Sequence, residues 1–217
     1  RSFTKSNIDQ GYLFLDSLKP PYVLKADGLA AGKGVIISSN LSEAKSSLKE
    51  MIEDEQFGQA SSCVVIEEFM KGVEVSVFAI TNGEQYKIIG HAKDYKRIGE
   101  GDTGLNTGGM GAVSPVPFAN NHFMNKVENQ IIKPTINGLK NDGLEYIGIV
   151  YFGLMNIDGE PKVVEYNVRL GDPEAEILLP RLKNDFVELM LACFDNSLNK
   201  KEIELENKSI ATIIMVS

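Results

Sequence analysis

Two lysines flank a glycine-rich run near the start of the chain, KADGLAAGKG. Gly32 and Gly34 would let backbone N–H groups approach phosphate oxygens, because glycine has no side chain in the way. Lys25 and Lys33 would add compact positive charges. The spacing is neither that of a P-loop nor that of a dinucleotide-binding turn. The run therefore predicts a phosphate-binding loop, with a plain glycine hairpin carrying two surface lysines as the alternative.

A second candidate is the run VIEEFM at residues 65–70, which is followed by Glu74. An apolar strand that ends in carboxylates and free backbone groups could hold an adenine on one side and a ribose on the other. Ribose hydroxyls are well matched by a carboxylate acceptor. An edge strand with solvated glutamates would give the same pattern.

A third candidate is VVEYNVR at residues 163–169, in which Glu165, Asn167 and Arg169 alternate with apolar residues. On a strand, positions i, i+2 and i+4 point to one face. Two oxygen ligands and a guanidinium there would suit Mg²⁺ bridging phosphates, with an arginine close by. A half-exposed polar strand is the alternative.

The fourth candidate is GDTGLNTGGMG at residues 101–111, inside a segment, 94–117, with six glycines and two prolines. The segment has neither helical nor strand periodicity, so it predicts a long loop. Its small polar groups and backbone donors are typical of a loop that closes over a small polar substrate. A mobile loop without a catalytic role is the alternative.

The elements that must position these motifs form an α+β pattern, with strands in hairpins and helices between them. The turn signals Asn82-Gly83 and Asp158-Gly159 support two of the hairpins. We expect a small lobe over residues 20–80 and a larger lobe over 1–19 and 81–217. Strands are expected at 22–26, 35–38, 63–69, 73–81, 86–92, 146–156, 162–167 and 210–216, and helices at 6–18, 41–54, 121–140 (disturbed at Pro134), 174–182 and 184–196.

Composition narrows the class of protein. The 217 residues carry a net charge of −8 and a sequence pI of about 4.9, so the basic field of a nucleic-acid binder is missing. No apolar run is long enough to cross a bilayer. Cys63 and Cys193 are expected to be reduced thiols of a cytoplasmic protein, and His91 and His122 lack metal-type spacing. Because the chain opens with Arg1 and closes on a strand-like run, we expect a fragment of a longer protein.

These four runs occur in the order found in phosphoribosylamine–glycine ligases, also called glycinamide ribonucleotide synthetases, and the sequence resembles that family across nearly its whole length. The matching runs are KADGLAAGKG, VIEEF, DTGLNTGGMG and VEYNVRLGDPE. The resemblance implies the ATP-grasp fold, in which two lobes with antiparallel sheets clamp ATP. It also implies ligation of glycine to 5-phosphoribosylamine through a glycyl phosphate, giving glycinamide ribonucleotide, ADP and phosphate in purine biosynthesis.

The resemblance further implies roles for individual residues. The expected ATP-binding residues are Lys25, Gly32, Lys33, Gly34, Glu67, Glu68, Phe69 and Glu74, with Glu74 on the ribose. The expected metal ligands are Glu165 and Asn167, holding Mg²⁺ or Mn²⁺. Arg169, Lys33 and Asp102 are expected to be catalytic, and Asp102, Thr103, Asn106, Thr107, Arg169 and Asp172 to contact glycine or phosphoribosylamine.

Two departures from the family pattern matter. Many ATP-grasp enzymes carry a further acidic ligand on the strand before the turn, whereas residues 151–154 hold no carboxylate and Gly153 stands near that position. The family's N- and C-terminal domains, which we expect as partners of this core, are also expected to lie outside these residues, so the fragment is expected to bind ATP without full turnover. Another ATP-grasp carboxylate–amine ligase and a non-catalytic ATP-binding module are the remaining alternatives.

Overall fold

The computed structural model describes residues 1–30, 34–101 and 103–215, so the predictions for Gly32, Lys33 and Asp102 lie outside the described residues. The chain divides into two compact units, Arg1–Met70 and Lys71–Ser217. Each unit contains its own antiparallel sheet and its own apolar core. The α+β class predicted from the sequence is confirmed.

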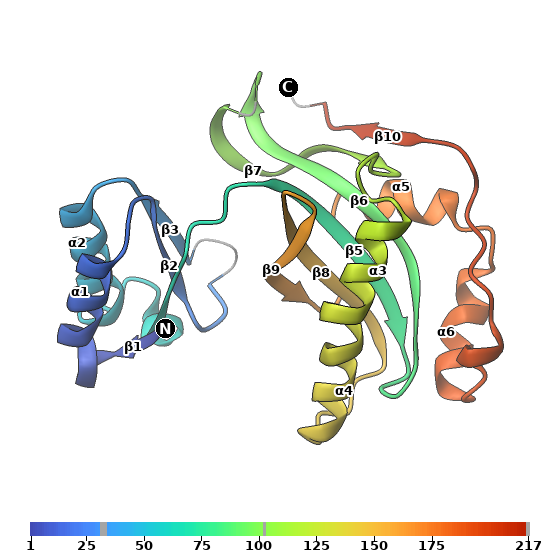
Figure 1. Cartoon of the computed structure of the whole chain (residues 1–217), viewed down its shortest axis with the longest axis horizontal. Coiled ribbons are helices and arrows are strands. Elements are labelled where there is room, and N and C mark those ends of the chain that lie inside the picture. The colour runs from blue at the N-terminus through green and yellow to red at the C-terminus, as the bar shows by residue number, and fades with distance from the viewer. Residues whose placement is uncertain (31–33, 102, 216–217) are drawn as a thin grey trace. The chain divides into compact units, whose positions relative to one another are not determined.

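The first unit is a four-stranded antiparallel sheet with two helices against it (Figure 1). Asn40 begins the second helix by accepting hydrogen bonds from the backbone N–H groups of Ser42 and Glu43. Leu15, Leu24 and Leu48 are fully buried between the helices and the sheet. The strands, in sheet order, are β1 (Ser2–Thr4), β4 (Cys63–Glu67), β2 (Tyr22–Ala26) and β3 (Val35–Ser38); the helices are α1 (Ile8–Ser17) and α2 (Leu41–Ile52).

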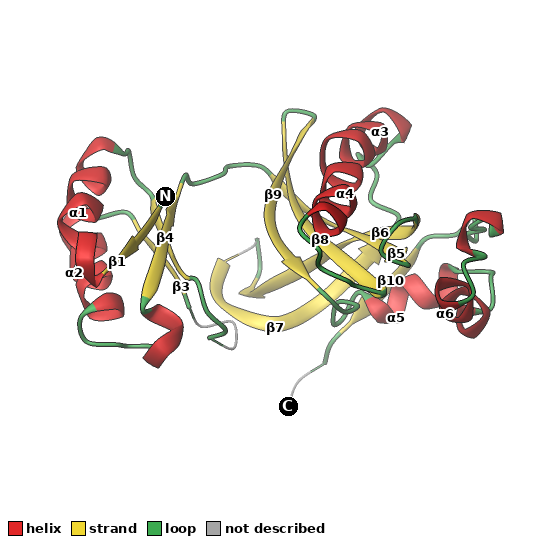
Figure 2. Ribbon diagram, turned by 90° about the horizontal axis from the view of Figure 1, so that it is seen from below, coloured by secondary structure: helices red, strands yellow, loops and turns green. Residues whose placement is uncertain are grey.

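The second unit is a six-stranded antiparallel sheet with helices on both faces (Figure 2). Its strands, in sheet order, are β10 (Ile210–Ile213), β7 (Thr103–Ser114), β6 (Tyr86–Gly99), β5 (Val73–Thr81), β8 (Gly148–Ile157) and β9 (Glu160–Asn167). Its helices are α3 (Asn121–Val127), α4 (Lys133–Asn141), α5 (Ala175–Leu178) and α6 (Phe186–Phe194). Among the residues described, none forms a helix long and apolar enough to span a membrane.

Strand alternation assigns the two faces of the central strand β5. Val75 and Val77 pack with α3 and α4, whereas Phe78 and Ile80 pack with α5 and α6. Because both faces are covered, β5 is apolar almost throughout and buried from Val75 onward. Nearer its start, the α5 face carries polar side chains in place of apolar ones, and this is where the candidate site lies.

The lobe boundaries expected from the sequence differ from this division. Residues 1–19 belong to the first unit, because β1 pairs with β4 and α1 packs on α2. Residues 71–80 belong to the second unit, because β5 lies between β6 and β8. Both segments are assigned to their units by the strands and helices that they contact, which local composition does not reveal.

The prediction of a long loop over residues 94–117 is wrong. Most of it forms the end of β6 and the whole of β7, which pair with two register shifts. Glycine has no side chain, so it gives no apolar and polar alternation from which a strand could be predicted. It also allows backbone angles that other residues disfavour, as at Gly104 (φ 83°) and Gly109 (φ 138°). At Gly111 a side chain would collide with β10, since a Cβ there would lie 2.5 Å from the Thr212 carbonyl oxygen.

The helix expected over 121–140 is present with its expected disturbance. A π-helical turn, Glu128–Ile132, joins α3 to α4 immediately before Pro134. Proline lacks a backbone N–H and its ring crowds the preceding turn, so a local change of helical pitch accommodates it.

Candidate functional site

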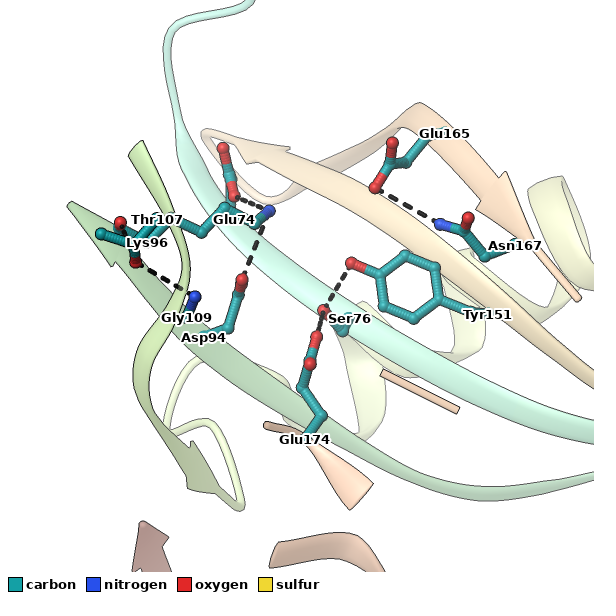
Figure 3. Close-up of polar contacts among 10 residues, drawn as sticks. All are labelled: Glu74, Ser76, Asp94, Lys96, Thr107, Gly109, Tyr151, Glu165, Asn167 and Glu174. Carbon is teal, nitrogen blue, oxygen red and sulfur yellow. Dashed lines mark hydrogen bonds and ion pairs between the residues drawn. The ribbon is translucent and has the colours of Figure 1, made fainter. Parts of the chain in front are cut away.

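Polar side chains from four neighbouring strands gather on the α5 face of the second unit's sheet (Figure 3). The register places Ser76 of β5 opposite Gly153 of β8, and Gly153 opposite Glu165 of β9. Residues two positions away along each strand share the same face. The gathered residues are Glu74, Ser76, Asp94, Lys96, Tyr151, Glu165 and Asn167, with Glu174 approaching from beyond β9.

Glu165 and Asn167 lie together at the end of β9, as the sequence predicted for a strand. The Asn167 side chain donates to Glu165 Oε1 at 3.4 Å, and Glu165 is exposed. Arg169 follows the end of the strand, and its guanidinium donates to the Leu170 carbonyl at 2.9 Å. The strand therefore presents a carboxylate and an amide side by side, and the arginine lies outside it.

The position facing Glu165 across the sheet has no side chain. A Cβ on Gly153 would lie 2.9 Å from Glu165 Cγ and 3.0 Å from Tyr151 Cε1, so both side chains use the space that glycine leaves. Within the described residues, no three His, Cys, Asp or Glu side chains form a metal-binding group. Two hard oxygen donors without a third protein ligand fit Mg²⁺, which commonly binds one or two protein oxygens plus phosphates and water.

Glu74, Lys96 and Asp94 form a second polar group, on β5 and β6. Lys96 Nζ lies 3.3 Å from Glu74 Oε2 and 3.3 Å from Asp94 Oδ2. Burial disfavours the charge of Lys96, but the attraction of the two carboxylates outweighs it and holds the lysine pKa above its usual value. Sequence reasoning missed Asp94 and Lys96; their i, i+2 spacing would have indicated them once β6 was known to extend to Gly99.

Ser76, Tyr151 and Glu174 form a buried hydrogen-bonded series beside this group. Ser76 Oγ lies 3.0 Å from the Tyr151 hydroxyl and 3.0 Å from Glu174 Oε1. Burial raises the pKa of Tyr151 to about 12, and burial, with the nearby Asp94 charge, also raises the pKa of Glu174. A Cβ on Gly171 would lie 2.3 Å from the Glu174 carboxylate, so glycine there lets this carboxylate fold back over its own chain. The sequence did not indicate this series.

The hairpin of β6 and β7 carries three of the predicted substrate residues. Thr107 Oγ1 donates to the Lys96 carbonyl at 2.8 Å and accepts from the Gly109 N–H, so it fixes the hairpin beside Lys96. Thr103 donates to the Glu100 carbonyl in the turn. Asn106 is exposed opposite Arg97, and Asp172, beyond β9, is also exposed.

The remaining predicted ATP-binding residues lie in the first unit. Lys25 Nζ and Glu67 Oε2 form an ion pair at 2.6 Å, which brings the glycine-rich run and the end of β4 together. Glu68 and Phe69 follow that strand and are exposed. The Gly34 carbonyl accepts from the Ala26 N–H at 2.7 Å.

Two α+β units with antiparallel sheets, and a strand bearing Glu165 and Asn167, define an ATP-grasp domain. Known structures support this class: a Campylobacter jejuni biotin carboxylase in a β-γ-ATP complex aligns with a TM-score of 0.69 over 94% of this chain and 44% of its own, at 15% identity, which shows the fold alone. The sequence profile of the phosphoribosylglycinamide synthetase ATP-grasp (A) domain matches residues 1–175. The chain belongs to that family.

Individual relatives agree with this assignment. The phosphoribosylamine–glycine ligase of Chlorobaculum tepidum is 47% identical over 91% of this chain and 46% of its own length, and that of Pasteurella multocida is 43% identical over 99% and 50%. The crystal structure of the Thermotoga maritima phosphoribosylamine–glycine ligase aligns with a TM-score of 0.85 at 35% identity, covering 98% of this chain and 54% of that one. The chain thus spans about half the length of the relatives that it matches.

Proposed function

We propose that this chain is the ATP-binding and catalytic core of a phosphoribosylamine–glycine ligase that acts in the cytoplasm. The observation that carries the proposal is the Glu165–Asn167 pair, which lies on the same face of the sheet as the Glu74–Lys96–Asp94 group in a chain of this family. The domains that make its relatives longer would be its structural partners, and ATP, glycine and 5-phosphoribosylamine its substrates.

The proposed reaction has two steps. A glycine carboxylate oxygen attacks the γ-phosphorus of ATP and ADP leaves, which gives glycyl phosphate. The amine of phosphoribosylamine then attacks the glycyl carbonyl carbon, the bond to phosphate breaks, and the amine loses one proton. Such transfers depend mainly on positioning and charge neutralisation, which the polar residues of this sheet face are suited to supply.

The chain's own residues divide this work. Glu165 and Asn167 would hold Mg²⁺ or Mn²⁺, which when bound neutralises phosphate charge. The Arg169 guanidinium would leave the Leu170 carbonyl and bind the transferred phosphate. The remaining proposed contacts are Lys25, Gly32, Lys33, Gly34, Glu67, Glu68 and Phe69 for the adenine and phosphates, Glu74 for the ribose, and Asp102, Thr103, Asn106, Thr107 and Asp172 for the substrates being joined.

Calorimetric titration of this chain with adenylyl imidodiphosphate, with and without Mg²⁺, tests the nucleotide site. We expect Mg²⁺-dependent binding that Glu165→Ala abolishes, because the carboxylate is the charged ligand of the pair. Binding that is indifferent to both Mg²⁺ and Glu165 would contradict the proposal. A substrate screen on the longer protein that contains this core, reading ADP release, would separate glycine and phosphoribosylamine from the substrates of other ATP-grasp ligases.

A further inference from the structure

Two side chains converge on the bare Cα of Gly153. The ring of Tyr151 and the methylene stem of Glu165 would lie 3.0 Å and 2.9 Å from a Cβ at this position. Glu165 is exposed, and its Oε1 accepts from the Asn167 side chain at 3.4 Å. The ring of Tyr151 is therefore a candidate wall against which the carboxylate of Glu165 is oriented.

The ring itself is held at two places. It packs against the ring of Phe78 in a T-shaped arrangement, with 5.1 Å between centroids and 74° between planes. Its hydroxyl lies 3.0 Å from Ser76 Oγ, which in turn lies 3.0 Å from Glu174 Oε1. Tyr151, Ser76 and Glu174 are each 5% exposed or less, so water does not compete for these contacts.

Both hydrogen bonds in this series start from the Ser76 hydroxyl. Its Oγ is placed to donate to the Tyr151 hydroxyl and to Glu174 Oε1, and its single proton serves one of these acceptors at a time. Glu174 lies in the RLGDPE run, so the series also ties that run to the middle of the sheet.

We propose that Tyr151 is a positioning residue for Glu165, held in place by the series through Ser76 to Glu174. This inference rests on the proposed function, since Glu165 is the proposed metal ligand. Groups that orient a metal ligand without touching the metal commonly change metal affinity by about 10–100-fold when they are removed. The series would thus act on metal affinity and not only on folding.

The test measures Mn²⁺ binding by electron paramagnetic resonance of free Mn²⁺, with adenylyl imidodiphosphate present. We expect Tyr151→Phe and Ser76→Ala each to weaken Mn²⁺ binding about 10-fold, and Ser76→Thr, which keeps the hydroxyl, to restore it. The matched control is Tyr166→Phe. That hydroxyl lies 3.3 Å from Thr135 Oγ1 and away from the series, so Mn²⁺ binding should stay within about twofold of the wild type.

Thermal melting of each variant separates positioning from stability. If Glu165→Ala abolishes Mn²⁺ binding while Tyr151→Phe and Ser76→Ala leave it unchanged, the positioning role is overturned and the proposed function stands. If Tyr166→Phe weakens Mn²⁺ binding as much as Tyr151→Phe does, general loosening explains the effect and the inference is also overturned. If the wild-type chain itself shows no Mn²⁺-dependent nucleotide binding, the proposed function and this inference are rejected together.

Discussion

Glu74 on β5 and Lys96 on β6 are joined by an ion pair, with 3.3 Å between Oε2 and Nζ (Figure 3). The same ammonium lies 3.3 Å from Asp94, whose side chain is only 6% exposed. One lysine thus compensates two carboxylates on neighbouring strands, which would otherwise repel each other. Through this ion pair, Lys96 also holds the carboxylate of Glu74, which is the proposed ribose contact.

Replacing Lys96 should therefore cost stability. We expect Lys96→Met to destabilise the chain by about 1–3 kcal/mol, because it leaves the Asp94 carboxylate buried without its ion partner. Urea unfolding measures the change. The matched control is Lys183→Met, which removes an exposed pair with Glu204 at 3.5 Å and should cost about 0–1 kcal/mol. Equal losses in both variants would contradict a special role for Lys96.

His91 gives a prediction about pH. Burial, together with the positive charge of Arg181, lowers its pKa from 6.5 to about 4, and its Nδ1 accepts from the Val116 N–H at 3.2 Å, which requires an unprotonated nitrogen. Between these two pH values the unfolded chain binds the proton and the folded chain does not. Stability contributed by His91 is therefore present above pH 6.5 and is lost as the pH falls toward 4.

The variant His91→Asn isolates this contribution, since its amide oxygen can accept the same hydrogen bond without titrating. Urea unfolding measured at several pH values between 6.5 and about 4 should show a smaller loss of stability in His91→Asn than in the wild type. His122→Asn, at an exposed histidine, serves as the control and should follow the wild-type profile. Parallel curves for all three proteins would show that His91 is not the group responsible.

Much of the framework could be predicted from the sequence where pattern and turn signals agree. The strands at 22–26, 35–38 and 73–81 were predicted with the bounds that the structure gives, because each is a short apolar run bounded by turn residues. The β6–β7 hairpin beyond Ala92 was missed, since its glycines carry no side-chain alternation. The end of β7, residues 111–114, also pairs with β10, which lies far along the chain.

The site residues also divide into those that a local sequence pattern reveals and those that only the fold brings together. Glu165 and Asn167 could be found because two residues on one strand reveal their common face in the sequence. Ser76, Tyr151 and Glu174 could not, because separations of 75 and 98 residues are closed only by the tertiary fold, through strand pairing for Tyr151 and through the approach of the segment before α5 for Glu174. A sequence pattern shows which side chains of one strand share a face. The fold decides which residues from other parts of the chain contact those side chains.

The contact between the β6–β7 hairpin and the RLGDPE run gives a third prediction. A Cβ on Gly109, whose φ is 138°, would lie 2.5 Å from the ring of Pro173. Gly109→Ala should therefore destabilise the chain by about 1–3 kcal/mol through strain and collision. Its neighbour Gly108 is the control, because a Cβ there would meet nothing within 4 Å. Urea unfolding of the pair decides the matter: similar losses in Gly108→Ala and Gly109→Ala would contradict a close approach at Pro173.

Gly34 gives a prediction for the proposed nucleotide site. A Cβ there would lie 2.8 Å from Ala30 Cβ and 3.0 Å from Ala26 Cβ, so Gly34→Ala should push apart the two sides of the glycine-rich run. If the run cradles phosphates through its backbone, adenylyl imidodiphosphate should bind about tenfold more weakly, a cost of roughly 1.4 kcal/mol. Gly138→Ala, in α4 with open space around it, controls for substitution of a glycine as such. Unchanged nucleotide affinity in a folded Gly34→Ala would remove this run from the proposed phosphate site, since the distorted segment would then have no part in holding the ligand.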